Sequence, residues 1–293
     1  MNRRDFLKRS ALLTAGTLIG SSAISSLLSL QSCSQALASK NFGLQLYSLR
    51  DGIAKDLDST FKFIADVGCK SIESAGYKEN GKIFGYEPLD IKKAAENYGM
   101  NISSSHVGRQ YRVGKEAETL EWWKKCFDVQ NELGVKYVIQ SYLPLGNSLD
   151  EVKICSDYFN TLADIAHSKG LQFGFHNHAK EFEKRDGVVI FDYFLQNANP
   201  NMAFQLDVYW AMKGGVDPTE FILKHGDKIP LLHIKDEDIV GASGTLNFES
   251  IFNAAYKMNV QDFFVEIESS PLVSPEECVS KSFEFLNNAS YVR

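Results

Sequence analysis

A regular alternation of short apolar segments with longer segments of helical periodicity constrains the fold of this chain more than any other feature. The short segments are typical of buried strands, and the longer ones space their apolar residues three or four positions apart, as amphipathic helices do. The expected strands are Phe42–Ser48, Ser71–Ser74, Asn101–His106, Tyr137–Gln140, Gln172–His176, Ala203–Asp207, Ile229–Ile234 and Asp262–Ile267. The expected helices are Ser59–Val67, Leu89–Tyr98, Glu116–Leu133, Leu149–Lys169, Ile190–Asn197, Pro218–His225, Phe248–Met258 and Pro275–Leu286.

Residues that start and stop helices support these boundaries. Asp58 and Asp217 stand where a helix N-cap is needed, and Asp217 is followed by Pro218, which favours the first helical position. A residue with left-handed backbone conformation often ends a helix before the next strand, and glycine adopts that conformation without strain. Four glycines occupy such places: Gly68, Gly99, Gly134 and Gly170.

Eight strand–helix alternations over about 250 residues match the length and element count of a (β/α)8 barrel. We therefore predict an α/β fold, the (β/α)8 TIM barrel, as a single domain over residues 41–293. An open, doubly wound sheet also alternates strand and helix and remains the alternative. Its dinucleotide-binding version is disfavoured, because no GxGxxG motif follows the first expected strand.

Residues 1–40 are predicted to be an export signal of the twin-arginine type. The basic start, Met1–Ser10, precedes the uncharged run Ala11–Leu30. Within it, Arg3–Arg4 followed by Asp5-Phe6-Leu7-Lys8 resembles the twin-arginine motif. A transmembrane helix is the competing interpretation, because about 20 residues span a bilayer, but Ser, Thr and Gly dilute this run. We expect an exported bacterial protein, periplasmic or anchored in a membrane facing the periplasm or the outside.

The first cysteine carries a second prediction about targeting. Leu30-Gln31-Ser32-Cys33 resembles a relaxed lipobox, in which Cys33 would be acylated after cleavage. Simple cleavage near Ala36–Ser39 is the other interpretation, and both stay open. A lipid on Cys33 is the only membrane contact that we expect. The other cysteines show neither CxxC pairs nor zinc-ligand spacing and are expected to be buried thiols: Cys69, Cys126, Cys155 and Cys278.

The charge balance argues against nucleic acid as a partner. The whole chain carries a net charge of −6, but residues 1–32 hold four Lys/Arg and one Asp. Without them, 27 basic and 36 acidic residues remain, which gives a net charge of −9. Binding to phosphates needs clustered Lys and Arg, so we expect a small-molecule ligand, a sugar or polyol, and no nucleic acid. Formation of a homo-oligomer stays open.

Four consecutive expected strands end in residues that bind divalent metals: His176, Asp207, His233 and Glu266. Each residue follows an apolar run, and the last four strands of a barrel are neighbours, so these side chains are expected to converge at its C-terminal face. Two imidazoles and two carboxylates suit Mn²⁺, Zn²⁺, Co²⁺ or Mg²⁺ without selecting one of them. The sequence therefore predicts one divalent ion at the barrel mouth.

Other polar and aromatic residues fall at the same end of the expected barrel. We expect them to contact substrate through hydrogen bonds or by stacking on a sugar ring. The polar candidates are Glu73, His106, Gln140, His178 and Lys235, and the aromatic candidates are Tyr47, Tyr77, Tyr142, Tyr209 and Trp210.

At these residues the chain resembles the xylose isomerase-like barrel superfamily, which includes the sugar phosphate isomerase/epimerase family. The resemblance covers residues 41–290 and rests on five segments: Gly43-Leu44-Gln45-Leu46-Tyr47-Ser48-Leu49-Arg50, Phe-His-Asn-His (175–178), Leu-Asp-Val (206–208), His-Ile-Lys-Asp (233–236) and Val-Glu-Ile-Glu (265–268). It implies one divalent ion held at the ends of strands five to eight, commonly by Glu, Asp, His and Glu. Asp207, His233 and Glu266 match that pattern.

The fifth strand departs from the family pattern. Sugar epimerases and apurinic endonucleases place Glu where this chain has His176, and His178 follows on the same face of the strand. Either histidine could ligate the ion while the other contacts substrate. Ketose 3-epimerases use that Glu and the Glu of strand eight as an acid/base pair, whereas a histidine-rich strand five is more similar to inosose dehydratases.

The resemblance implies proton abstraction next to a carbonyl, with an enediolate stabilised by the ion. We expect His176 or His178 to be the base, and Glu266 or Glu268 as the second choice. The predicted function is a metal-dependent isomerase or epimerase of a free keto-sugar, aldo-sugar or polyol. No phosphate-binding loop or arginine cluster is present, which argues against a phosphorylated substrate.

Three alternatives remain. A lyase or hydratase, similar to inosose dehydratase or cleaving 3-keto-glycosides, would use the same residues. A sugar-binding barrel lipoprotein without catalysis would keep the fold alone. An apurinic endonuclease relative is disfavoured by the net charge of −9.

Overall fold

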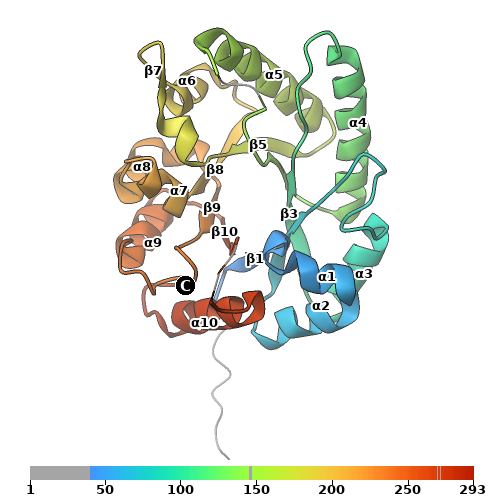
Figure 1. The fold of residues 1–293 in the computed structure, drawn as a ribbon, viewed down its shortest axis with the longest axis vertical. Coiled ribbons are helices and arrows are strands. Elements are labelled where there is room, and N and C mark those ends of the chain that lie inside the picture. Colours follow the sequence, from blue (N-terminus) through green and yellow to red (C-terminus); the bar gives the residue numbers. More distant parts are fainter. Residues whose placement is uncertain (1–39, 145–146, 269, 271) are drawn as a thin grey trace, which may run out of the picture. The chain divides into compact units, whose positions relative to one another are not determined.

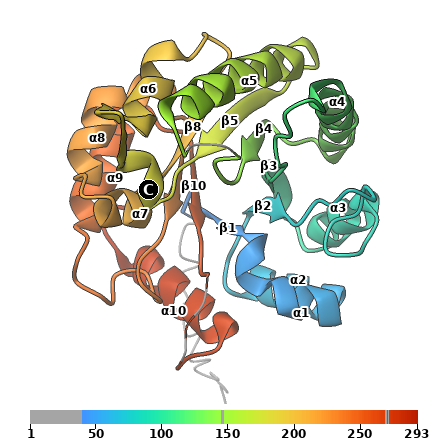
Figure 2. The same cartoon turned by 45° about the horizontal axis from the view of Figure 1, so that its top comes forward.

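Eight parallel strands close into one barrel in the computed structural model, which describes residues 40–144, 147–268, 270 and 272–293. The strand order around the barrel is β1-β10-β9-β8-β5-β4-β3-β2, so the predicted (β/α)8 TIM barrel is confirmed. Figures 1 and 2 show the strands as an inner ring and the helices outside it. The barrel strands are β1 (Gly43–Gln45), β2 (Ser71–Ala75), β3 (Asn101–Val107), β4 (Tyr137–Gln140), β5 (Gln172–His176), β8 (Ala203–Asp207), β9 (Leu231–Ile234) and β10 (Asp262–Val265).

The helices that follow these strands agree closely with the sequence pattern. Asp217 caps its helix through the amides of Thr219 and Glu220, as expected. The cap of the first long helix is instead Asp56, which accepts from the Ser59 amide, so the expected cap Asp58 lies inside that helix. The long helices are α2 (Leu57–Asp66), α3 (Pro88–Asn97), α4 (Glu116–Leu133), α5 (Leu149–Ser168), α6 (Ile190–Asn197), α8 (Pro218–His225), α9 (Phe248–Lys257) and α10 (Pro275–Asn288). The four expected left-handed glycines all have positive φ: Gly68, Gly99, Gly134 and Gly170.

The structure also contains short helices and strands that the sequence analysis did not predict. Strand β1 ends at Gln45, not at Ser48, because the Gln45 side chain caps a 3₁₀ helix, Leu46–Leu49, that leads into α1 (Arg50–Lys55). A hairpin of β6 (Lys184–Arg185) and β7 (Val188–Val189) turns at Asp186-Gly187, a pair that readily adopts the positive φ of a tight turn. Helix α7 (Val208–Lys213) follows β8 directly.

The core consists of an outer apolar layer between strands and helices and a smaller cluster inside the barrel. In the outer layer, Phe159 of α5 stacks on Phe175 of β5 with ring centroids 5.0 Å apart. Since side chains alternate along a strand, an outward Phe175 directs the next residue, His176, into the barrel. The inner apolar cluster is Tyr137, Ile139, Leu231 and Phe264.

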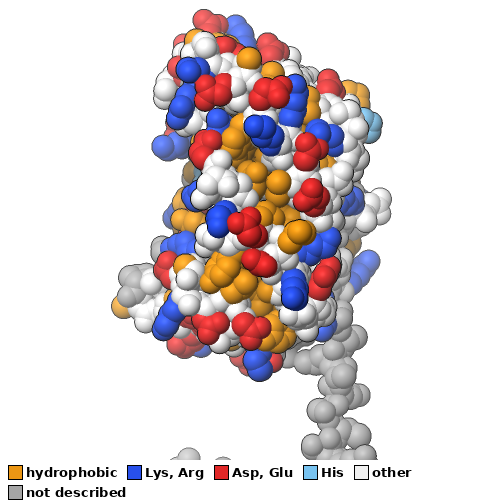
Figure 3. All heavy atoms as spheres, turned by 90° about the vertical axis from the view of Figure 1, so that its right-hand side faces the viewer, with side chains coloured by type: hydrophobic (Ala, Val, Ile, Leu, Met, Phe, Trp, Pro, Cys, Tyr) orange, Lys and Arg blue, Asp and Glu red, His pale blue; other side chains and the backbone are white. Residues whose placement is uncertain are grey.

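In Figure 3, which shows the side of the molecule that carries α3 and α4, basic and acidic side chains are interspersed over the surface.

The four expected buried thiols are buried: Cys69, Cys126, Cys155 and Cys278. Among the described residues, no helix is both long and apolar enough to cross a membrane. The twin-arginine motif at Arg3–Arg4 and the lipobox at Cys33 lie outside the described residues.

Replacing Gly43 with Ala is expected to destabilise the barrel by about 1–3 kcal/mol, the usual cost of overpacking. A Cβ atom at Gly43 would lie 2.2 Å from the main-chain oxygen of Ser71 in β2, which cannot rotate away. Urea denaturation of the variant measures the change in the free energy of unfolding.

Gly52→Ala is the matched control for this measurement. Its Cβ would approach the Thr60 hydroxyl, a side-chain atom, at 3.1 Å, and alanine favours a helix over glycine by about 1 kcal/mol. Equal stability of Gly43→Ala and wild type would contradict the close approach of β1 to β2.

Candidate active site

Four predicted metal ligands meet at the C-terminal end of the barrel. His176, Asp207 and His233 are the last or nearly the last residues of β5, β8 and β9, and Glu266 directly follows β10. All four are buried, and each offers a ligand atom within 4.8 Å of the others. The convergence expected from the sequence is therefore present in the structure. The arrangement could hold one divalent cation through nitrogen and oxygen atoms.

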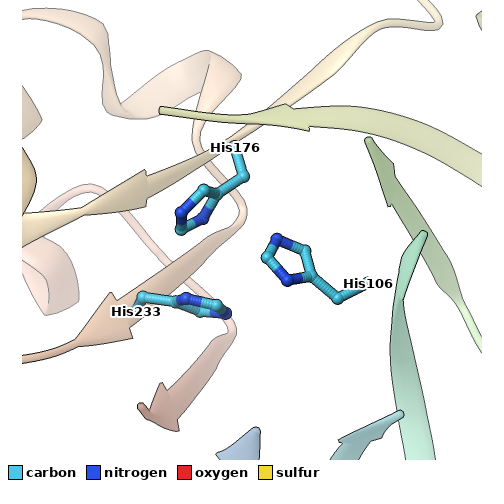
Figure 4. Close-up of side chains that lie close together, drawn as sticks. All are labelled: His106, His176 and His233. Atoms are coloured by element: carbon cyan, nitrogen blue, oxygen red, sulfur yellow. The ribbon is translucent and has the colours of Figure 1, made fainter. Parts of the chain in front are cut away.

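A third imidazole, that of His106 on β3, lies against this cluster. Figure 4 shows the rings of His106, His176 and His233 directed toward one another from three strands. The ring centroid of His106 is 4.7 Å from that of His176 and 5.1 Å from that of His233. The three histidines form a second group whose nitrogen atoms are close enough to share a metal ion.

Glu73, which we expected to contact substrate, lies inside the barrel and does not line the cavity described below. One of its oxygens, Oε1, is 2.7 Å from His233 Nε2. The other, Oε2, accepts hydrogen bonds from Ser104 Oγ at 2.6 Å and Gln205 Nε2 at 2.8 Å. With both oxygens occupied by protein donors, Glu73 is placed to orient His233 and not to meet a ligand.

The charge of His233 is set by the carboxylates on its two sides. Its Nδ1 atom is 3.2 Å from Glu266 Oε2, opposite the contact with Glu73. Burial alone would lower the pKa of His233, but the negative charges of Glu73 and Glu266 raise it to about 10. Burial raises the pKa of Glu73 and of Glu266, but the charge of His233, its hydrogen bonds and other nearby groups together outweigh burial, so both carboxyls have a lowered pKa.

Two polar atoms of the cluster have no hydrogen-bond partner among the described residues, although both are buried. They are Nε2 of His176 and Oδ2 of Asp207. Burial and the nearby charge of His233 hold the pKa of His176 far below its usual value, so its imidazole is neutral. Burial raises the pKa of Asp207 to about 7. Buried polar atoms without partners are rare in folded proteins and are expected where an ion or ligand binds.

A cavity of about 690 Å³ opens above the cluster, large enough for a sugar. Among the predicted site residues, those that line it are Tyr47, Tyr77, His106, Tyr142, His178, Glu266 and Glu268. Trp210 lines a neighbouring cavity of about 490 Å³, which shares Tyr142 and His178 with the first. Gln140, Lys235 and Tyr209 are absent from both walls, and so are the buried His176, Asp207 and His233.

The three predicted residues that do not line either cavity contact residues or loops that do. Gln140 donates to the main-chain oxygens of Arg109 and Tyr142 and so fixes the loops after β3 and β4. The Lys235 ammonium lies 3.1 Å from Glu268 Oε1, which also accepts from Trp210 Nε1 at 3.2 Å. Tyr209 packs on Trp210 with ring centroids 5.2 Å apart.

His178 is the imidazole most open to the cavity. Its ring lies between those of His176 and Trp210, at centroid distances of 4.9 and 5.6 Å. Its main-chain amide donates to Glu181 Oε2 at 2.7 Å. Burial lowers the pKa of His178, which favours the neutral ring, and this ring lines the cavity. Its side chain also accepts from the Glu181 main-chain amide in a capping box.

Several residues of the site were not predicted, among them Ser104 and Gln205 in the hydrogen-bond network and Arg50, Lys78 and Ser141 in the cavity wall. Two of them had a signal in the sequence that strand alternation could have revealed. Ser104 and Gln205 precede His106 and Asp207 by two residues, so each shares a strand face with a predicted site residue.

The sequence matches the model of the xylose isomerase-like TIM barrel family over residues 61–289. The chain belongs to this family. Among xylose isomerase-like barrels of known structure, a sugar phosphate isomerase/epimerase from Parabacteroides distasonis is 34% identical to it, with a TM-score of 0.82. That match covers 87% of this chain and all of the other.

Two further proteins similar to this chain are more distant. D-allulose 3-epimerase from Methylomonas sp., solved in complex with D-allulose, is 19% identical with a TM-score of 0.69 and shows the shared fold. That match covers 85% of this chain and 96% of the epimerase. Inosose dehydratase from Geobacillus kaustophilus is 24% identical over 181 residues, which span 54% of this chain and 56% of that relative.

Replacing Glu73 with Gln is expected to lower the pKa of His233 from about 10, because the change removes one of the two negative charges that raise it. The amide keeps the size of the side chain. An NMR titration of the imidazole resonances in chelator-treated protein measures this pKa. Glu79→Gln is the control, since the exposed Glu79 pairs with Arg109 and has no contact with His233. An unchanged His233 pKa in Glu73→Gln would show that the contact does not set the charge.

Proposed function

We propose that the protein is a divalent-metal-dependent isomerase or epimerase of a free keto-sugar, aldo-sugar or polyol. The observation that carries this proposal is a pair of buried atoms, His176 Nε2 and Asp207 Oδ2, that have no hydrogen-bond partner among the described residues and lie beside His233 and Glu266. A cation would satisfy both atoms and would balance the carboxylates. The cavity above the cluster supplies room for the sugar.

The proposed ligands are His176, Asp207, His233 and Glu266. Their donor set fits Mn²⁺, Zn²⁺, Co²⁺ or Mg²⁺. Glu73 supports the assignment, because metal-binding histidines usually donate their second ring N–H to a carboxylate. When bound, such an ion polarises a carbonyl oxygen and acidifies the neighbouring C–H bond.

His178 is the proposed base, ahead of Glu268. As proposed metal ligands, His176 and Glu266 have their lone pairs committed, whereas His178 is neutral and lines the cavity. Glu268 also lines the cavity, but one of its oxygens is held by Lys235 and Trp210. A proton taken from one carbon by His178 and returned to another carbon or face gives isomerisation or epimerisation.

A lyase or hydratase is the second candidate, and two observations favour it. His176 replaces the glutamate that sugar epimerases place on this strand, and a relative of 24% identity is an inosose dehydratase. In that case the same proton abstraction would be followed by loss of a β-leaving group. The products separate the two reactions, since only elimination releases water or an alcohol.

Protein purified without chelator and without a histidine tag is expected to contain about one equivalent of Mn, Zn, Co or Mg. Asp207→Ala and His233→Ala should lose it, because each removes one of four ligands. Elemental analysis measures the content, and circular dichroism checks the fold. His167→Ala is the control, since that histidine is exposed on α5 and should retain the metal. Absence of metal after reconstitution of folded wild type would remove the catalytic proposal.

In D₂O, a substrate among free ketoses, aldoses and keto-polyols is expected to gain deuterium at the carbon that exchanges its proton. His178→Asn should slow this exchange by about 10²–10⁴-fold, the usual contribution of a general base, while keeping the metal. NMR of the products measures both exchange and reaction type. Lys180→Ala, next to the site but without a proposed chemical role, is the control. If a sugar binds but no deuterium exchange occurs, the protein is a sugar-binding barrel without catalytic activity.

A further inference from the structure

The side chain of Gln45 contacts His106 in a way that fixes which ring nitrogen carries the proton. Gln45 Oε1 accepts a hydrogen bond from the main-chain amide of Tyr47, because Gln45 caps the 3₁₀ helix after β1. This contact leaves the amide group, Nε2, facing His106 Nδ1 at 2.9 Å. An amide NH₂ only donates, so Nδ1 must accept with its lone pair.

It follows that neutral His106 carries its proton on Nε2. This atom is buried and has no partner among the described residues. His106 lines the large cavity together with Glu266 and His178. The imidazole thus keeps an N–H that no described residue accepts, on a side chain that lines the cavity.

The neighbouring His176 is held in the opposite form by a second glutamine. Gln205 Nε2 donates to the Glu73 carboxylate at 2.8 Å, which fixes the direction of the Gln205 amide. Its oxygen then faces His176 Nδ1 at 3.0 Å and accepts from it. The proton of His176 is therefore on Nδ1, and Nε2 keeps a free lone pair.

We propose that Gln45 and Gln205 assign opposite tautomers to two adjacent histidines, so that His176 offers a lone pair to a metal ion and His106 offers an N–H to a ligand oxygen. His106 is consequently not a metal ligand, although its nitrogens are close enough to join His176 and His233. Binding a cation through Nε2 would move the proton to Nδ1, where it would meet the NH₂ of Gln45.

The ligand atom that His106 contacts must be an acceptor: a carbonyl oxygen, or the oxyanion that forms from it. A neutral N–H donor fixed in a buried site stabilises developing negative charge on oxygen without reorganising. This part rests on the proposed function, since it assigns His106 to the carbonyl of that substrate. Gln45 is a positioning residue, because it acts only through His106.

Nitrogen-15 NMR of histidine-labelled, metal-free protein tests the two tautomers directly. The chain has six histidines, few enough to resolve, and the signals of His106 and His176 are identified by their loss in His106→Asn and His176→Asn. The expected result is a protonated Nε2 in His106 and a protonated Nδ1 in His176. A protonated Nδ1 in His106, or rapid exchange between both forms, would overturn the proposal.

Gln45→Glu provides the second test, because a carboxylate at this position would accept from Nδ1. We expect Nδ1 of His106 to become protonated in this variant. The matched control is Gln196→Glu, an exposed position on α6, in which His106 and His176 should both keep the tautomers of the wild-type protein. An unchanged His106 in folded Gln45→Glu would contradict the assigned role of Gln45. If a variant does not fold, the protonated ring nitrogens seen in the wild-type spectrum still test the proposal.

Addition of Zn²⁺ to the labelled wild-type protein separates this inference from the proposed function. The signals of His176 and His233 should shift, whereas the Nε2–H of His106 should persist. Loss of that proton on Zn²⁺ binding would make His106 a ligand and overturn the inference. Failure of Zn²⁺, Mn²⁺, Co²⁺ and Mg²⁺ to bind would count against the proposed function, while the tautomers of the metal-free protein would still stand.

Discussion

Glu73 and His233 meet inside the barrel, where neither side chain reaches solvent. A lone carboxylate at that depth would be strongly unfavourable, and so would a lone imidazolium. Their 2.7 Å contact compensates both charges, and the donors Ser104 and Gln205 complete the shell of Glu73. The same shell orients His233 and, through Gln205, His176. The proposed metal ligands at the barrel mouth are therefore held by a polar network that the barrel encloses.

The apolar part of the fold determines which residues can belong to this network. Phe173 and Phe175 of β5 pack outward against aromatic rings of α4 and α5. The ring centroids of Phe175 and Phe159 are 5.0 Å apart. Alternation along the strand then turns His176 inward. Deeper in the barrel, Tyr137, Ile139, Leu231 and Phe264 form an apolar layer. The four proposed metal ligands thus lie at the end of the interior where the strands finish.

The sequence predicted the elements well where a compact apolar run stood between clear turn signals. Strands β4, β5 and β8 have the bounds that their apolar runs indicate. The end of β1 was missed, because it depends on the contact of the Gln45 side chain with the Tyr47 amide. The convergence of the four proposed ligands was predictable, since each lies at or next to the end of a strand. The contacts of Glu73 inside the barrel could not be predicted, because its partners His233 and Gln205 are 160 and 132 residues away in the sequence.

The contact between Glu73 and His233 joins β2 to β9, which are not neighbours in the barrel. Loss of His233 would leave the buried Glu73 carboxylate without its charged counterpart, and loss of Glu73 would leave His233 with Glu266 alone, so the two positions do not vary independently. Substitutions at the two positions are expected to appear together among related barrels, and with them the residue at Gln205, which contacts the same carboxylate. The evolutionary unit of this site thus includes residues that never touch the ligand.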